Sequence, residues 1–184
     1  SATFFCVGPQ VEKWPDMARR ELDYGHTVGS HTMDHTYAED VHAASQLLQD
    51  REQVLALHAA QIGPEPVLFR APGGNYGKYQ KHEVGWPLIQ WSSSAGDTGK
   101  NTERQLARHL TANAEDGSIL LLHDIYMKTA VSAEEYLAEF YQRGFLTATV
   151  EELLSLAGLE PEPNEVYVSV PTAFTTGGIP DGAL

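Results

Sequence analysis

The sequence predicts an α/β fold, in which parallel β-strands alternate with helices. Short apolar runs of the kind found in strands buried on both faces recur along the chain, for example at 2–8 and at 118–124. Segments of helix-forming residues that end in Gly stand between such runs, as at 15–25 and 101–117. Parallel strands need crossover connections, so this alternation is typical of a single α/β domain.

The first half of the chain supplies five of the expected elements. The run ATFFCVG at 2–8 is continuously apolar and ends in Gly, which favours a buried strand. Helix formers follow at 15–25, with Pro at the start and Gly at the end, and a short strand is expected at 26–31. The longest helical candidate spans 38–63 and closes on a Gly, and the strand at 66–77 runs into a Gly-rich loop.

The second half continues the alternation of strand and helix. Apolar runs predict its strands, and helical spacing after a polar start predicts its helices. These elements are expected at 86–93 (strand), 101–117 (helix), 118–124 (strand), 132–144 (helix), 145–150 (strand) and 150–159 (helix). The domain is therefore expected to span 1–160, with 161–184 as a C-terminal tail rich in Pro, Gly, Thr and Glu. Within that tail EVYVSV at 165–170 is a candidate for an added edge strand.

Length and composition exclude several classes of protein. With 184 residues, of which 42% are hydrophobic, the chain is long enough to bury a core as one domain. A net charge of −13 argues against nucleic acid or an anionic membrane surface as a partner. No apolar run approaches the ~20 residues of a membrane span, and no signal peptide is recognisable in this sequence. The single cysteine, Cys6, excludes an intrachain disulfide and is expected to be a buried, inert thiol.

Ionisable residues follow four of the predicted strands. In parallel α/β folds the carboxyl ends of the strands meet at one rim, where ligands bind. The residues delivered to that rim are His31, His35, Arg70, Asp97, His123 and Asp124. This convergence of four separate segments is the strongest sign of an active site that the residues give by themselves.

Each motif at the rim has a functional and an ordinary explanation. In SHTMDHT (30–36), one helical turn would bring His31 and His35 within reach of one cation such as zinc, but two such residues also occur by chance on exposed turns. The loop after Arg70 in FRAPGGNYG brings backbone N–H groups close to a ligand, or is a plain turn. His123 in ILLLHD is either a general acid or base or a satisfied core residue.

Taken together and in order, the motifs resemble the NodB-type polysaccharide deacetylases (carbohydrate esterase family four). The similarity runs from the ATFF segment near the start to about residue 159. It comprises GHTVGSHTMDH at 25–35, FRAPGG at 69–74, the Trp-containing strand IQWSSSAGD at 89–97, and LLHD at 121–124. The resemblance implies a distorted (β/α) barrel of seven or eight strands and metal-assisted hydrolysis of acetyl groups on a glycan.

The resemblance also implies roles for individual residues. His31 and His35 would ligate a divalent metal, usually zinc, and Thr32 would help to position their loop. His123 would protonate the departing sugar amine, and Asp97 would tune that histidine. The remaining implied roles are an arginine that holds the base carboxylate (Arg70), a backbone N–H in the oxyanion hole (Gly73) and a wall of the acetyl pocket (Leu122).

Two departures from the family pattern qualify these roles. The family begins with a strand ending in Thr-Phe-Asp-Asp, which supplies the general base and the third metal ligand, and no such strand occurs in this sequence. The interval of about 30–40 residues fits one β–α unit, so we expect a partial chain of a longer deacetylase that lacks its first unit. In SSAGDT (93–98), Asp97 is kept, but Ser94 and Thr98 replace an Asp and a Trp of the family.

The sequence thus favours a metal-dependent deacetylase that acts on peptidoglycan or a chitin-like polymer of N-acetylglucosamine. Two alternatives stay open at this point: a non-catalytic glycan-binding module on the same scaffold, and an O-acetyl (xylan) esterase. The family suggests an extracellular or cell-envelope location for the full-length protein.

Overall fold

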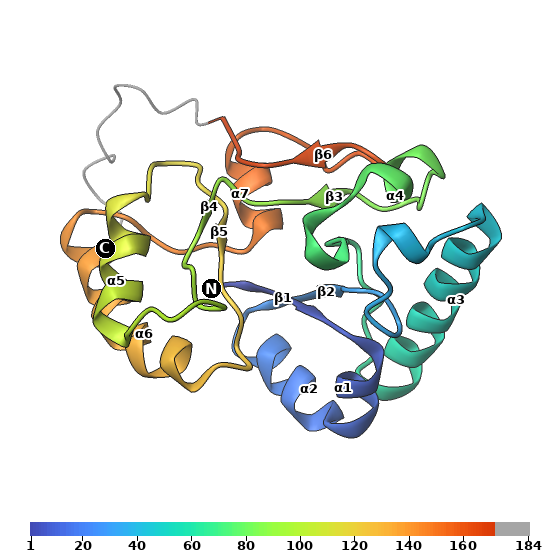
Figure 1. Ribbon diagram of the computed structural model, residues 1–184, viewed down its shortest axis with the longest axis horizontal. Coiled ribbons are helices and arrows are strands. Elements are labelled where there is room, and N and C mark those ends of the chain that lie inside the picture. The colour runs from blue at the N-terminus through green and yellow to red at the C-terminus, as the bar shows by residue number, and fades with distance from the viewer. Residues whose placement is uncertain (172–184) are drawn as a thin grey trace.

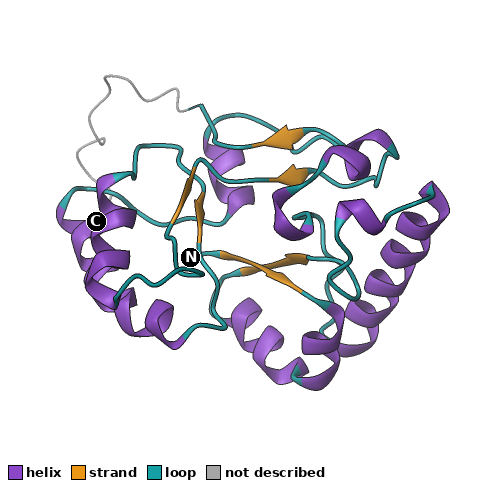
Figure 2. Cartoon of the chain, viewed as in Figure 1, coloured by secondary structure: helices purple, strands orange, loops and turns teal. Residues whose placement is uncertain are grey.

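The computed structural model describes residues 1–171, in which short parallel strands are flanked by helices (Figures 1 and 2). The strands are β1 (Thr3–Cys6), β2 (Thr27–Ser30), β3 (Leu88–Ile89), β4 (Ser93–Ser94), β5 (Leu120–Leu121) and β6 (Val166–Tyr167). The helices are α1 (Gly8–Lys13), α2 (Pro15–Asp23), α3 (Ala44–Gln61), α4 (Gly77–Lys81), α5 (Glu103–Ala112), α6 (Met127–Gln142) and α7 (Val150–Leu156). Two 3₁₀ turns, η1 (Ala38–Asp40) and η2 (Pro72–Gly74), complete the described elements. The α/β architecture predicted from the sequence is therefore correct.

The strands form three parallel pairs. β1 pairs with β2 in a register that places Thr3 opposite Thr27. β3 pairs with β6, and β4 pairs with β5. Each pair is parallel, as the crossover helices between the predicted strands require. In the described residues these ladders do not join into one closed barrel.

The extended segment at Phe69 connects the first two pairs. Phe69 forms isolated parallel bridges to Ser30 on one side and to Leu88 on the other. The order across this part of the molecule is thus β1, β2, the Phe69 segment, β3 and β6. Leu68 and Phe69 are both fully buried although their side chains point to opposite faces, which explains why this stretch reads as a continuous apolar run.

Helices cover the outside of the strands. In Figure 1, α1 and α2 lie below β1 and β2, α3 lies on the right, and α5 and α6 lie together on the left. Phe69 and Trp86 stack with ring centroids 5.8 Å apart in the core beside α3, and Leu154 of α7 is buried in a second cluster with Leu68. The helices α5 and α6 enclose a third cluster around Leu106. Burial of these side chains supplies the main driving force that holds each helix against the strands.

Several element boundaries differ from the prediction. The segment 145–150 forms no strand, although its alternating pattern is typical of one. The Ser1 amino group donates to the Thr147 carbonyl (3.3 Å) without forming a ladder, and Thr149 then caps α7 by accepting the Glu152 N–H. The helix expected at 38–63 begins only at Ala44, after η1. The short helices α1 and α4 were not predicted, although Pro at the start of α1 is a signal that could have revealed it.

Residues 165–170 pack on the domain through β6. The pairing of Val166 with Leu88 shows that EVYVSV does contain an added strand, next to β3. Val170 is buried, and an antiparallel bridge joins Ser169 to Ser118. The domain boundary at 160 stays a prediction, and residues 172–184 lie outside the described part of the chain.

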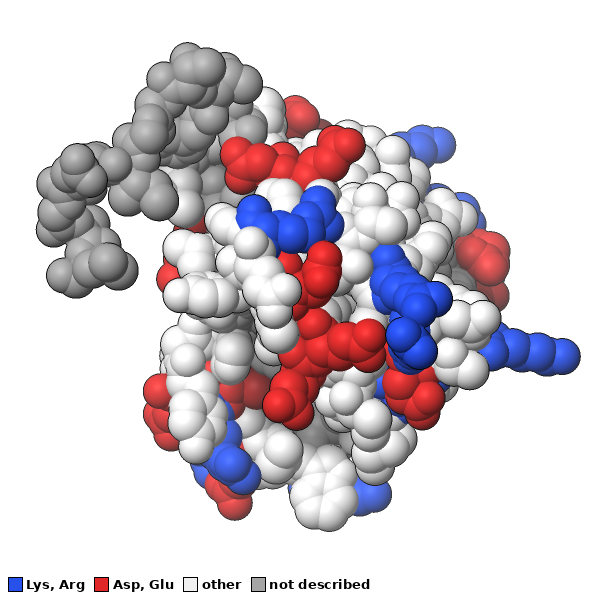
Figure 3. Space-filling view, turned by 90° about the vertical axis from the view of Figure 1, so that its left-hand side faces the viewer, with Lys and Arg blue, Asp and Glu red and all other residues white. Residues whose placement is uncertain are grey.

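The surface carries charges of both signs. On the face that Figure 3 shows, acidic side chains gather near the centre and basic side chains stand in small separate groups around them. Such a mixed face offers no extended basic stripe of the kind that follows a nucleic-acid backbone. Within residues 1–171, no helix has the length and apolar character needed to cross a membrane.

Candidate active site

The two histidines of the SHTMDHT motif lie in the loop that follows β2. His31 is anchored by its backbone N–H, which donates to the Cys6 carbonyl at the end of β1 (3.1 Å). The rings of His31 and His35 meet edge to face, with centroids 4.9 Å apart. The expectation that one helical turn brings them together is wrong, because 31–37 is irregular. Left-handed backbone at Thr32 (φ 67°) and His35 (φ 61°) turns the chain so that the rings meet.

His31 is held in one orientation and one protonation state. Its Nδ1 lies 2.6 Å from the main-chain oxygen of Arg70, which can only accept, so Nδ1 carries the proton and Nε2 keeps a free lone pair. Burial lowers the pKa of His31 to about 4, and the nearby positive charges of His35, Arg70 and His123 act in the same direction. A neutral imidazole with a fixed tautomer is the form that binds a metal ion.

Arg70, whose main-chain oxygen binds His31, is a buried cation. Its guanidinium donates from Nε to the Ile89 carbonyl and from Nη2 to the Gln90 carbonyl, each at 3.1 Å, and lies 4.3 Å from the ring centroid of Phe5. Burial lowers its pKa to about 10, so it remains charged at neutral pH. Among residues 1–171 no carboxylate lies within 4.0 Å of it. The expected contact between Arg70 and a base carboxylate therefore stays a prediction.

Asp97 and His123 form a hydrogen-bonded pair, although they are far apart in sequence. Asp97 Oδ1 lies 2.9 Å from Nδ1 of His123, and Oδ2 accepts the backbone N–H of the same residue (2.5 Å). The hydroxyl of Thr129 on α6 donates to Oδ2 as well (3.1 Å). The Asp97 side chain is 0% exposed, whereas 36% of the His123 side chain remains open to solvent. A buried acid thus orients an accessible imidazole, as general acid–base chemistry requires.

The loop after Arg70 includes Gly73, the expected oxyanion-hole residue. Gly73 has φ 65°, and a Cβ at this position would approach the Tyr37 ring to 3.1 Å, so both the backbone conformation and the space favour glycine. Leu122 is half-buried against the cluster between α5 and α6. The roles of Gly73 in the oxyanion hole and of Leu122 in the acetyl pocket stay predictions.

The donor set can be compared with what a metal ion needs. His31 and His35 supply two adjoining imidazoles, a ligand type that suits zinc and cobalt. Catalytic zinc sites usually have three protein ligands. Residues 1–171 contain no group of three His, Cys, Asp or Glu side chains that could hold a metal ion. His31 and His35 therefore fit two of the ligand positions of a metal site.

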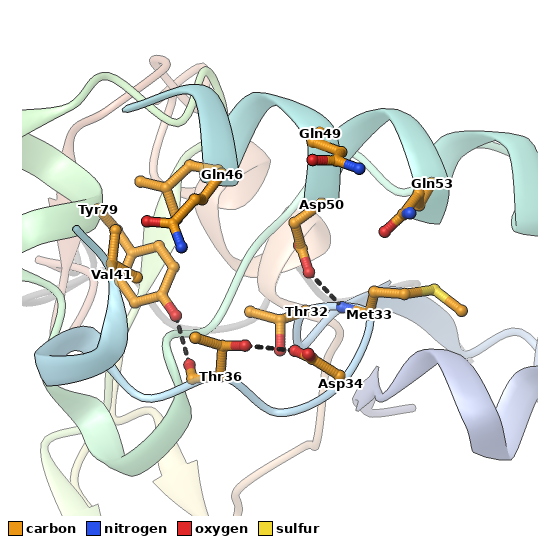
Figure 4. Close-up of a pocket in the computed structure, with 11 residues that line it drawn as sticks. Thr32, Met33, Asp34, Thr36, Val41, Gln46, Gln49, Asp50, Gln53 and Tyr79 are labelled. Carbon is orange, nitrogen blue, oxygen red and sulfur yellow. Dashed lines mark hydrogen bonds between the residues drawn. The ribbon is translucent and has the colours of Figure 1, made fainter. Parts of the chain in front are cut away.

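Two residues that the sequence does not single out contact the histidine loop. Asp50 of α3 accepts the backbone N–H of Met33 (2.7 Å), and the hydroxyl of Tyr79 in α4 donates to the Thr36 carbonyl (2.5 Å), as Figure 4 shows. Both residues line a cavity of about 260 Å³ between the loop and α3. No local pattern marks them, because each contact joins segments that are distant in the sequence.

Comparison with known proteins identifies the family. The family model for polysaccharide deacetylases matches residues 1–84. A peptidoglycan-N-acetylglucosamine deacetylase of Bacillus cereus is 31% identical over 161 residues, covering 83% of this chain and 75% of that protein. The chain belongs to the polysaccharide deacetylase family. The resemblance seen in the sequence motifs is thereby confirmed.

Other relatives of this polysaccharide deacetylase extend the comparison. A peptidoglycan-N-acetylglucosamine deacetylase of Listeria monocytogenes is 35% identical over 155 residues, which are 83% of this chain but only 32% of that protein. The chain thus spans about a third of the length of this relative. A deacetylase structure with bound substrate superposes with a TM-score of 0.83 at 27% identity, over 90% of this chain and 81% of the other.

A family 4 acetyl xylan esterase from Clostridium thermocellum, solved with a cobalt ion, gives a TM-score of 0.84 at 24% identity. The alignment covers 92% of this chain and 85% of that one. At this level of identity the likeness concerns the fold alone. It places the chain within the α/β fold of the family and leaves the full count of barrel strands and the absence of a first unit as predictions.

Proposed function

We propose that this domain removes N-acetyl groups from N-acetylglucosamine units of a polysaccharide, with peptidoglycan as the first candidate and a chitin-like polymer as the second. The relatives named above as peptidoglycan-N-acetylglucosamine deacetylases support this substrate class. The observation that carries the proposal is the Asp97–His123 pair, with its open imidazole, at the same rim as the neutral His31. A cell-envelope or extracellular site of action follows from that substrate.

Each residue of the rim has a place in the proposed hydrolysis. His31 and His35 would hold a divalent metal, most simply zinc, as two of its protein ligands. When bound, such an ion polarises a carbonyl and lowers the pKa of coordinated water. The Gly73 N–H would donate to the oxyanion, while Leu122 would form one wall of the acetyl pocket.

His123 and Asp97 would carry out the proton transfer. His123 would give its proton to the departing sugar amine, and Asp97 holds the ring in the tautomer and orientation for that transfer. Arg70, buried and positively charged, would position the carboxylate that acts as general base.

The experiment measures acetate released from peptidoglycan and from N-acetylglucosamine oligomers by the natural full-length protein. Activity should require a divalent metal, disappear with a chelator and return with zinc or cobalt. His31→Ala should abolish it, whereas His109→Ala, on the exposed surface of α5, should leave it unchanged. Full activity after complete metal removal would refute the proposal.

Two observations favour a second function, a glycan-binding module without catalysis. The described residues supply only part of a metal site, and the fourth motif has Ser94 and Thr98 in place of the family's Asp and Trp. Metal analysis separates the two functions, because about one zinc per chain is expected of the enzyme and none of the binding module. An O-acetyl esterase would share the enzyme's residues, and a panel including acetylated xylan would reveal it.

A further inference from the structure

The loop that carries His31 and His35 has a backbone conformation that needs support from its surroundings. Thr32 and His35 both adopt positive φ, which costs a residue with a side chain roughly 1–2 kcal/mol. Such conformations persist where neighbouring structure fixes them. The Thr32 hydroxyl is buried and makes no hydrogen bond, so the residue expected to steady the loop does not do so through its side chain.

Side chains from two helices supply that support. The Met33 N–H, which lies between the two histidines in the chain, donates to Asp50 Oδ1 (2.7 Å). The Thr36 carbonyl, directly after His35, accepts from the Tyr79 hydroxyl (2.5 Å). Figure 4 shows the two bonds reaching the same loop, with Asp50 pointing down from α3 and Tyr79 approaching from α4. The bonds thus hold the loop on both sides of His35.

The two supporting residues are themselves fixed in place. Tyr79 is 1% exposed, and its ring packs on Phe69 with centroids 5.0 Å apart. Asp50 stands in the middle of the 18-residue helix α3, whose Leu47 and Val54 are buried in the same core. Burial and, to a smaller extent, the charge of Asp34 raise the pKa of Asp50 to about 6, so the carboxylate is ionised at pH 7.5 and accepts the Met33 N–H.

We propose that Asp50 and Tyr79 are positioning residues that set the separation and direction of the His31 and His35 rings and thereby the affinity of the metal site. This inference rests on the proposed function, because it takes the two histidines as metal ligands. Neither residue is among the proposed metal ligands. They act through the backbone of Met33 and Thr36, at a distance from the reacting atoms.

The test compares metal affinity in matched variants of the full-length protein. Cobalt and zinc binding are measured at pH 7.5 without substrate, by competition with a chelating dye. Asp50→Ala removes the acceptor and should weaken binding by about 10- to 100-fold, the range known for outer partners of metal ligands. Asp50→Asn keeps an oxygen that accepts the Met33 N–H and should restore affinity to within about threefold.

Tyr79→Phe gives an independent arm if Asp50→Ala fails to fold. It removes only the hydroxyl that donates to Thr36 and leaves the ring on Phe69, so metal affinity should fall while the thermal midpoint changes little. The visible spectrum of bound cobalt should also change, because it reports ligand geometry. Gln49→Ala is the matched control: Gln49 lines the same cavity from α3 but makes no hydrogen bond to the loop, and this change should leave affinity unaltered.

The outcomes separate this inference from the proposed function. Normal metal affinity and an unchanged cobalt spectrum in both Asp50→Ala and Tyr79→Phe would overturn the positioning role and leave the proposed function standing. Absence of metal binding in the unaltered protein would overturn both. Equal losses in Asp50→Ala and Asp50→Asn would show that the negative charge, not the bond to Met33, is what matters, and would also overturn the inference.

Discussion

Replacement of Asp97 by Asn tests the Asp97–His123 pair most directly. The carboxylate accepts three hydrogen bonds, two from His123 and one from Thr129. Asn has a single acceptor oxygen, and its NH₂ group must face at least one donor. If that donor is the ring, the neutral imidazole moves its proton from Nδ1 to Nε2, which disrupts the tautomer on which the proposed proton transfer depends.

The size of the expected loss in stability follows from the same contacts. A hydrogen bond to a charged group contributes about 1.5–3 kcal/mol, and two of the three bonds to Asp97 come from groups shielded from water. Because the His123 ring is 36% exposed, its share is reduced by solvent. The loss in free energy of unfolding should therefore be roughly 2–3 kcal/mol, or about 5–10 °C in thermal midpoint for a domain of this size. The loss in kcat should be larger, about 10²- to 10⁴-fold.

The assay measures both quantities in the same preparations. Urea unfolding gives the free energy, and acetate release from N-acetylglucosamine oligomers gives kcat. Thr129→Val is the control, since it removes one bond to Asp97 Oδ2, should cost about 1–2 kcal/mol, and should change kcat only a few-fold. If Asp97→Asn loses stability as expected but retains the unaltered protein's kcat, the assignment of His123 as the catalytic acid is refuted.

Two further predictions concern stability. Burial raises the pKa of Glu21 from 4.5 to about 7, so the contribution of the protonated carboxyl to stability is fully present below pH 4.5 and is lost as the pH rises through 7. Glu21→Gln should therefore stabilise the domain by about 1–2 kcal/mol at pH 8, whereas urea unfolding at pH 4 should show no gain. Gly74→Ala would place a Cβ 2.5 Å from the Trp91 ring at φ 73° and should cost about 2–4 kcal/mol, whereas Gly63→Ala, with no atom within 4 Å, should cost only about 1 kcal/mol in the same assay.

The sequence predicts best those features that depend on local pattern. The strand β1 reads as an apolar run, and its residues TFFC are partly buried on both faces. The helix α5 begins where Thr102 and Gln105 form a capping box, which a sequence displays directly. Because parallel strands end at the same edge of a sheet, the residues that follow them were expected to lie close together. Asp97 and His123 do so, although they are 26 residues apart in the chain.

Features that depend on contacts between distant segments could not be predicted in this way. The segment 145–150 has the alternation of a strand, but its bonds to the start of the chain do not form a ladder, and pairing, not propensity, makes a strand. The irregular loop at 31–37 was expected to be a helical turn because nothing in its sequence reveals left-handed backbone at Thr32 and His35. The bond from Asp50 to Met33 has no sequence signal at all, since many carboxylates lie on predicted helices.

The two histidines that matter most to the proposed chemistry are distinguished by their surroundings, not by their type. Burial, helped by nearby positive groups, lowers the pKa of His31, and the bond from its Nδ1 to the Arg70 carbonyl keeps the single proton on Nδ1, so the Nε2 lone pair stays available to a cation. His123 is bonded to the buried carboxylate of Asp97, which stabilises the positive charge that forms when the ring takes up a proton. In the proposed mechanism, one residue type would thus serve as a ligand at one side of the rim and as a proton carrier at the other. A neutral carbonyl in place of Asp97 would remove the stabilisation of the protonated ring, and with it the proposed proton transfer, even though His123 itself remained in place.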